Sequence, residues 1–143
     1  MLPFASQIRF AAFQAQEAVC RLRGEALPDR VRRLAAEGWE AREKPGTIAD
    51  AKARIVEALA DLDSLQADAL DAGAELAISL DLPDGLAFDL TGESYARDWA
   101  LPQFYFHVVG AYAILRSQGI AIGKADYVPH MFTYLRTGAP TPA

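Results

Sequence analysis

The sequence predicts a mainly α-helical bundle with three long helices and a small β-hairpin before the last of them. Apolar residues recur at helical spacing over residues 3–23 and 47–70, as in amphipathic helices. Residues 101–119 carry one charged side chain, Arg116, and no polar stripe, which is typical of a buried central helix. Two alternating segments around a Pro-Asp-Gly turn at residues 83–85 predict the hairpin.

Length and composition indicate a single domain. The chain has 143 residues, of which 52% are hydrophobic, enough for a substantial core. We expect residues 1–136 to form this domain, and residues 137–143, with their prolines and glycine, to form a flexible tail. A net charge of −5 disfavours nucleic-acid binding, which depends on basic patches.

The chain shows none of the sequence signs of export or membrane insertion. The N-terminus lacks a basic segment followed by an apolar core, and the single cysteine, Cys20, cannot form an internal disulfide. The uncharged run before Arg116 falls short of the ~20 apolar residues that span a bilayer, and it contains Pro102 and Gly110. We therefore expect a cytoplasmic protein.

The first predicted helix has an apolar face and two phenylalanines away from it. The apolar face consists of Phe4, Ile8, Ala11, Ala12, Ala15, Ala18, Val19 and Leu22, and Gly24 ends the helix. Phe10 and Phe13 project to the opposite side, among charged residues. Two exposed aromatic rings within one turn suggest a second contact surface. They predict a homodimer formed through this helix.

Two further helical segments follow. Asp29 is expected to cap a short helix over residues 30–37, whose arginines form a solvated face rather than an anion site. Trp39 is expected to pack this connection onto the domain. Thr47 and Asp50 resemble a capping box that opens the helix over residues 47–70, whose acidic residues point outward.

The last long helix follows the hairpin. Alternation of Leu76, Ile78, Leu80 and Leu82, and of Leu86, Phe88 and Leu90, places one hairpin face against the helices. Pro102 suits a first helical turn, and Gly119 suits the position after the last. Whether residues 96–118 form one kinked helix or two is left open by the pattern.

The C-terminal third resembles an uncharacterised family of short bacterial proteins within the DinB/YfiT-like superfamily of metalloenzymes. The matching residues are Leu101-Pro102, Phe104-Tyr105-Phe106-His107, Ala111-Tyr112, Ile114-Leu115-Arg116, Gly119, Gly123-Lys124 and Asp126-Tyr127. Met1-Leu2-Pro3-Phe4 with Gln7 resembles the start of the second bundle helix of that family. The resemblance implies a DinB-like, up-down four-helix bundle with sites between helices.

The sequence departs from the resemblance in two ways. Family members carry about one further helix before the segment that begins here at Met1, so the first family helix is expected to be missing, through truncation or replacement by another subunit. The superfamily binds a divalent metal through three histidines, two of them spaced His-x-x-x-His on the last helix. Here Ala111 stands four residues after His107, residues 3–23 contain no histidine, and His130 lies near the tail. We expect no metal cofactor; if a metal binds, His107 is the ligand.

Four residues are candidates for a small-ligand site: His107, Tyr105, Tyr112 and Gln7. We expect His107 to be buried and hydrogen-bonded to a neighbour, beside a small apolar cleft shared with Tyr105. The two tyrosines are expected to be core aromatics with satisfied hydroxyl groups. A thiol in an alanine-rich helix, as at Cys20, is expected to be inert.

Three functions remain open at this point. The first is a metal-free, non-catalytic, dimeric protein that binds a small ligand. The alternative is a metal-dependent transferase acting on a thiol cofactor, as the resemblance implies for some relatives. A regulatory binding module is the third. Whether the protein is an enzyme is therefore undecided.

Overall fold

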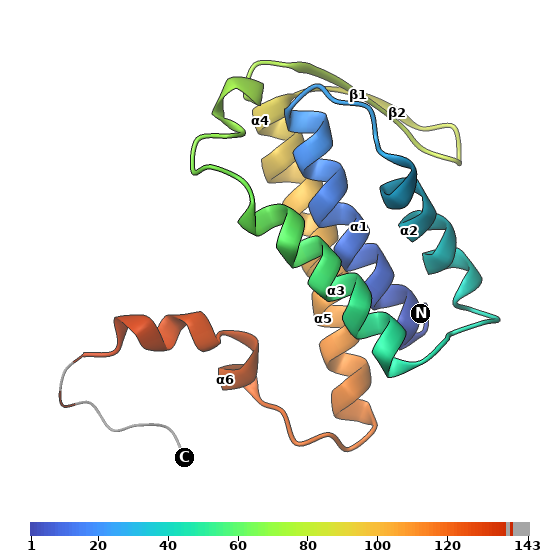
Figure 1. The fold of residues 1–143 in the computed structure, drawn as a ribbon, viewed down its shortest axis with the longest axis vertical. Helices are drawn as coiled ribbons and strands as arrows, with labels where there is room; N and C mark the ends of the chain where they lie inside the picture. Colours follow the sequence, from blue (N-terminus) through green and yellow to red (C-terminus); the bar gives the residue numbers. More distant parts are fainter. Residues whose placement is uncertain (137, 139–143) are drawn as a thin grey trace.

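The computed structural model describes residues 1–136 and 138 and shows a helical domain with a hairpin at one end (Figure 1). Three helices pack lengthwise against a fourth, α1, which lies between them. The four helices are α1 (Phe4–Leu22), α2 (Asp29–Glu40), α3 (Ile48–Asp63) and α5 (Leu101–Ser117). The prediction of a mainly helical fold with a hairpin before the last long helix is confirmed.

The central helix is α1 and not, as predicted, the apolar α5. Residues of α1 are buried on several sides, and they include polar ones such as Ser6, Gln7 and Gln14. On α5, by contrast, Tyr105 and Phe106 are more than half exposed. An all-round apolar helix needs neighbours on every side to be buried, and among the described residues α5 has extensive contacts along the bundle with α1 alone.

The ends of α2 and α3 are set by local polar contacts. Asp29 does not cap α2 as predicted, because it is the first helical residue and pairs with Arg32 at 2.8 Å. The capping box of Thr47 and Asp50 is confirmed. However, α3 ends at Asp63, seven residues earlier than predicted, where the Ser64 hydroxyl donates to the Asp61 carbonyl at 2.6 Å and competes with helix continuation.

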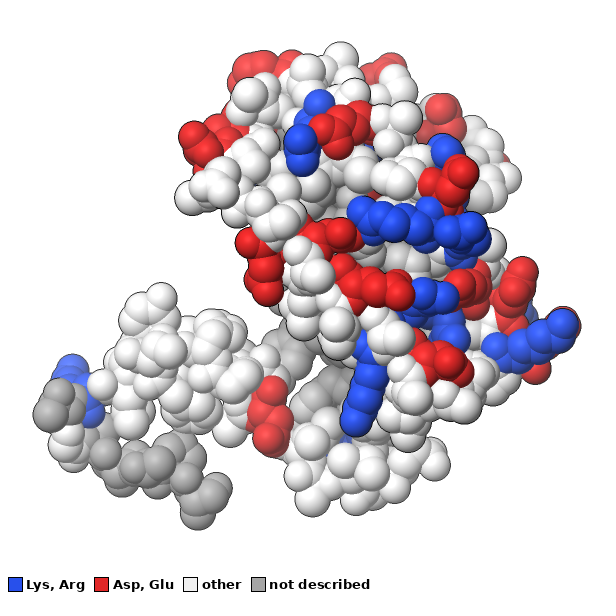
Figure 2. All heavy atoms as spheres, viewed as in Figure 1, with Lys and Arg blue, Asp and Glu red and all other residues white. Residues whose placement is uncertain are grey.

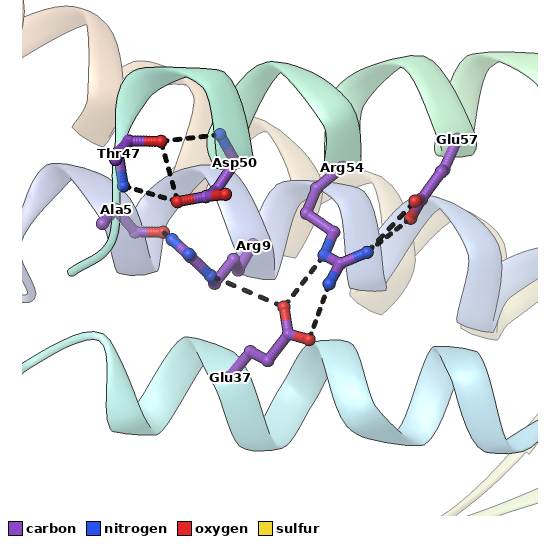
Figure 3. A network of polar contacts seen from close by, with 7 residues as sticks. All are labelled: Ala5, Arg9, Glu37, Thr47, Asp50, Arg54 and Glu57. Atoms are coloured by element: carbon purple, nitrogen blue, oxygen red, sulfur yellow. Dashed lines mark hydrogen bonds and ion pairs between the residues drawn. The ribbon is translucent and has the colours of Figure 1, made fainter. Parts of the chain in front are cut away.

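A carboxylate on α2 ties three helices together (Figure 3). Glu37 accepts two hydrogen bonds from Arg54 of α3, at 2.8 and 2.9 Å, and lies 3.7 Å from the buried Arg9 Nε of α1. Arg54 also pairs with Glu57. Opposite charges are interspersed over the face that α2 and α3 present in Figure 2, without a continuous basic patch on that face.

The hairpin consists of β1 (Ala77–Asp81) and β2 (Ala87–Thr91), which pair antiparallel with Ser79 opposite Asp89. Ile78 and Leu80 of β1 are buried, and Ile78 packs in a cluster with Leu22 and Tyr95. Because alternate residues of a strand point to opposite faces, this burial fixes the hairpin across the end of the helices.

After the hairpin the chain forms one continuous helix, which answers the question left open by the sequence. It runs through α4 (Gly92–Ser94), the π-helical η2 (Tyr95–Ala100) and α5 without a non-helical residue. Pro102 lies inside this helix and does not open it. Since proline has no N–H and its ring clashes with the carbonyl four residues earlier, the wider π turn accommodates it.

The chain then leaves the bundle as an arm, residues 118–136, which Figure 1 shows extending away from the helices. It contains α6 (Lys124–Tyr127) and the 3-10 helix η3 (Pro129–Tyr134). Tyr127 packs on Tyr112, with 5.8 Å between ring centroids. The predicted flexible tail, residues 137–143, lies outside the described residues except for Gly138. Within the described chain, every helix is too short or too polar to traverse a bilayer.

Candidate functional site

A cleft of about 430 Å³ lies between α1, α2, the hairpin and α5, with His107 in its wall. Its aromatic residues are Phe10, Phe13, Trp39 and Trp99, and its polar and charged residues include Gln14, Glu17, Arg21, Asp81 and Gln103. The volume falls within the range of small-molecule pockets, about 300–1,000 Å³. The sequence elements that form the cleft are far apart in the chain and meet only because each packs on α1.

Phe10 forms the aromatic floor of this cleft and is not a surface residue. Its side chain is only 6% exposed, stacks on the His107 ring at 5.2 Å and meets Trp39 edge-on at 5.1 Å. Gly38 makes this possible, because a Cβ there would lie 2.8 Å from the Phe10 ring. Phe13 is half-buried against the cluster of Ala12, Leu34 and Ala58. The premise of the predicted dimer, two exposed phenylalanines on the first helix, is therefore wrong.

His107 is held in one tautomer by Gln7. Its Nδ1 lies 2.8 Å from Gln7 Oε1, while Gln7 Nε2 donates to the Leu2 carbonyl at 3.3 Å. With the amide oriented in this way, Nδ1 of His107 must carry the proton and donate, which leaves Nε2 as an acceptor. Burial lowers the pKa of His107, which favours the neutral ring.

Two residues of the cleft wall, His107 and Gln14, have acceptor atoms without a hydrogen-bond partner in the described chain. His107 lines the cleft, and its Nε2 has no hydrogen bond to a described residue and is not one of the fully buried unpartnered atoms. Gln14 also lines the cleft, and its buried Oε1 has no partner within the described chain. A ligand N–H or O–H group could pair with His107 Nε2 directly, whereas the fully buried Gln14 Oε1 would first have to turn toward the cleft.

The structure brings two of the four predicted site residues together and separates the others from them. Gln7 and His107 form a pair, as described above. Tyr105 is 52% exposed and packs on Phe104, outside the cleft, so the expectation of a core aromatic is wrong for it. Tyr112 is half-buried against Tyr127 near the start of the arm.

The thiol of Cys20 lies elsewhere and is buried. Burial, and to a lesser extent the nearby carboxylate of Glu25, raises the pKa of this thiol. Since the thiolate is the nucleophilic form, these surroundings disfavour reactivity.

Sequence reasoning missed most of the cleft. Phe10 and Phe13 indicated a second contact surface, because they lie outside the apolar face of their helix. We assigned that surface to an intermolecular contact, whereas both residues line the cleft. Trp39 was expected to pack inward. Nothing in the local sequence linked Trp99 or the hairpin to His107.

The helical architecture and the hairpin define a DinB-like protein. The crystal structure of a DinB family member protein from Shewanella denitrificans is similar, with a TM-score of 0.65 and 26% sequence identity over 99% of this chain and 70% of that chain. Residues 1–128 match the model of the family described as Domain of unknown function (DUF1993), and the chain belongs to that family. No protein of curated function matches.

The residues around His107 do not fit the three-histidine metal site of the superfamily. Nδ1 of His107 is engaged by Gln7, and the residue one turn later is the buried Ala111. Within the described residues no group of three or more His, Cys, Asp or Glu side chains is arranged to hold a metal ion. A single imidazole nitrogen among aromatic rings is a poor divalent-metal site.

Proposed function

We propose that this DinB-like protein is a metal-free, non-catalytic binding protein for a small aromatic molecule that carries hydrogen-bond donors. The observation that carries the proposal is the aromatic cleft over His107, whose neutral ring presents Nε2 as an acceptor. Pockets with apolar walls and a few placed polar groups are the usual form of small-molecule sites.

Aromatic side chains would supply most of the affinity. Phe13, Trp39 and Trp99 surround the cleft, and Trp39 is more than half exposed. Each favourable aromatic pair contributes about 0.5–1.5 kcal/mol beyond the area that it buries. A flat ring is therefore the shape that these walls would hold best.

The polar and charged groups of the cleft wall determine which polar groups a ligand should carry beside its ring. Leaving a buried acceptor such as Gln14 Oε1 unpaired costs about 1–3 kcal/mol, which a donor on the ligand would recover once the Gln14 side chain turned toward the cleft. The charges in the wall are Glu17, which pairs with Arg21 at 2.9 Å, and Asp81. Arg21 balances one of the two carboxylates, so the wall carries one net negative charge and the cleft favours a neutral or cationic ligand over an anion.

The binding experiment uses indole and tryptamine as probes, with affinities measured by isothermal titration calorimetry and contact with the site followed by NMR shifts of the His107 ring. We expect tryptamine to bind more tightly, because it adds an ammonium donor. His107→Phe keeps a flat ring but removes the acceptor, and should weaken tryptamine binding about tenfold. Tyr105→Ala, outside the cleft, is the matched control and should bind like the wild type. Absence of shifts at His107 with either probe would contradict the proposal.

The alternative, a metal-dependent transferase acting on a thiol cofactor, requires a ligand set that the described residues do not assemble. It is tested by elemental analysis of untagged wild-type protein and of His107→Ala. A near-stoichiometric divalent metal that disappears in the variant would favour the transferase and overturn the metal-free proposal.

A further inference from the structure

A second hollow lies on the opposite face of α1 from the cleft, between α3 and α5. It has a volume of about 290 Å³ and is lined by apolar side chains alone, including Ile8 and Ala11 of α1, Leu59 of α3, and Phe104 and Val108 of α5. We call it the α3–α5 groove. A concave surface without a polar group offers nothing to water or to a charged ligand, and is suited to another apolar segment.

Large apolar side chains continue this surface on both rims. On α3, Leu59 is 51% exposed and Ile55 is also exposed, and both line the groove. On α5, Leu101 and Tyr105 are exposed on the side that adjoins Phe104 and Val108 at helical spacing. Monomeric proteins rarely leave a contiguous apolar surface of this kind uncovered.

The arm of the same chain has the complementary property. Residues 127–135 contain no Asp, Glu, Lys or Arg. Met131, Phe132, Tyr134 and Leu135 of this segment are all exposed. Figure 1 shows the arm projecting from the end of α5, and Figure 2 shows its described part almost free of charged side chains. The chain therefore has an open apolar groove and, beyond the contact of Tyr127 with Tyr112, an apolar segment whose large side chains are exposed.

We propose that the α3–α5 groove binds the arm of a second copy of this chain, and that the protein is a dimer in which the two arms are exchanged. A two-fold arrangement uses both grooves and both arms, because the contact made by one copy is repeated by the other. The second copy supplies the arm because, beyond the contacts of Tyr127 with Tyr112 and of Ile122 with Arg116, each arm extends away from its own helices (Figure 1).

The first test is the mass of the full chain in solution by light scattering, with Leu59→Glu and Phe132→Glu. The wild type should have the mass of two chains. Both side chains are exposed in one copy, so neither substitution should unfold it, which circular dichroism checks. Each should weaken the dimer at least about a hundredfold, because it buries a charge in an apolar contact. Val56→Glu is the matched control, since Val56 is 64% exposed on the same helix and does not line the groove.

A second experiment identifies the segment in the groove. Chains carrying Leu59→Cys are mixed with chains carrying Phe132→Cys and oxidised; Cys20 is buried and should not react. We expect a disulfide-linked pair in the mixture. A monomeric wild type overturns the proposal, whether the groove is empty or filled by the chain's own arm. A dimer that resists Phe132→Glu or gives no cross-link also overturns it, because another surface then covers the groove.

Discussion

Gln7 on α1 and His107 on α5 are joined by a contact of 2.8 Å between Oε1 and Nδ1, although they are 100 positions apart in the sequence. The contact links the two helices beside the cleft and determines which nitrogen of the imidazole carries the proton. Gly110 leaves room for it, since a Cβ at that position would lie 3.0 Å from the Gln7 amide. The pair is thus a positioning device for the acceptor on which the proposed function depends.

Replacing Gln7 by glutamate should raise the pKa of His107. The carboxylate would lie against Nδ1–H and stabilise the charged imidazolium, whereas in the wild type burial lowers this pKa. An NMR titration of the His107 ring protons measures the effect. Gln103→Glu is the control, because Gln103 lines the same cleft without a hydrogen bond to His107. An equal shift in both variants would show that the Gln7 contact has no special role.

The stability of the protein should fall as the pH drops below about 6.5, the ordinary pKa of histidine. Because the pKa of His107 is lowered in the folded state, the unfolded chain binds more protons between the two pKa values, so stability rises with pH in that window. Urea unfolding at pH 7.5 and pH 5.5 measures the difference. In His107→Phe the difference should be smaller. An equal loss in the wild type and the variant would assign the pH dependence to other groups.

Glu37→Ala should destabilise the fold by about 1–3 kcal/mol, the usual cost of leaving a buried polar group without its partner. The substitution removes both hydrogen bonds to Arg54 and the nearest carboxylate to the buried Arg9. Denaturant unfolding measures the loss. Asp98→Ala, in an exposed pair with Arg97, is the control and should cost less than about 1 kcal/mol. Equal losses would mean that the three-helix contact is no stronger than a surface pair.

Gly38→Ala should also destabilise the protein, by about 1–3 kcal/mol, as overpacking of a core does. The new methyl group would lie 2.8 Å from the Phe10 ring and displace it from His107 and Trp39. In an unobstructed helix the same substitution stabilises by about 1 kcal/mol, so the sign of the change in unfolding free energy is the test. A stabilised Gly38→Ala protein would show that Phe10 moves aside without cost.

The sequence by itself determined the local features of this protein. Three local predictions appear in the structure: the helix within residues 3–23, the capping box of Thr47 and Asp50, and the hairpin around Pro-Asp-Gly. Each depends on residues a few positions apart, through helical periodicity, a side-chain hydrogen bond or a turn. The resemblance of the C-terminal third also indicated the family correctly.

Tertiary structure decided which helix is central and where the candidate site lies. The burial of Phe10 depends on Gly38 and Trp39 of another helix, and the exposure of Tyr105 depends on the absence of a described neighbour over that side of α5. The cleft combines side chains from α1, α2, β1, η2 and α5. Apolar periodicity shows which side chains are suited to burial. It does not identify the residues that they contact, because contacts between distant segments depend on how whole helices pack.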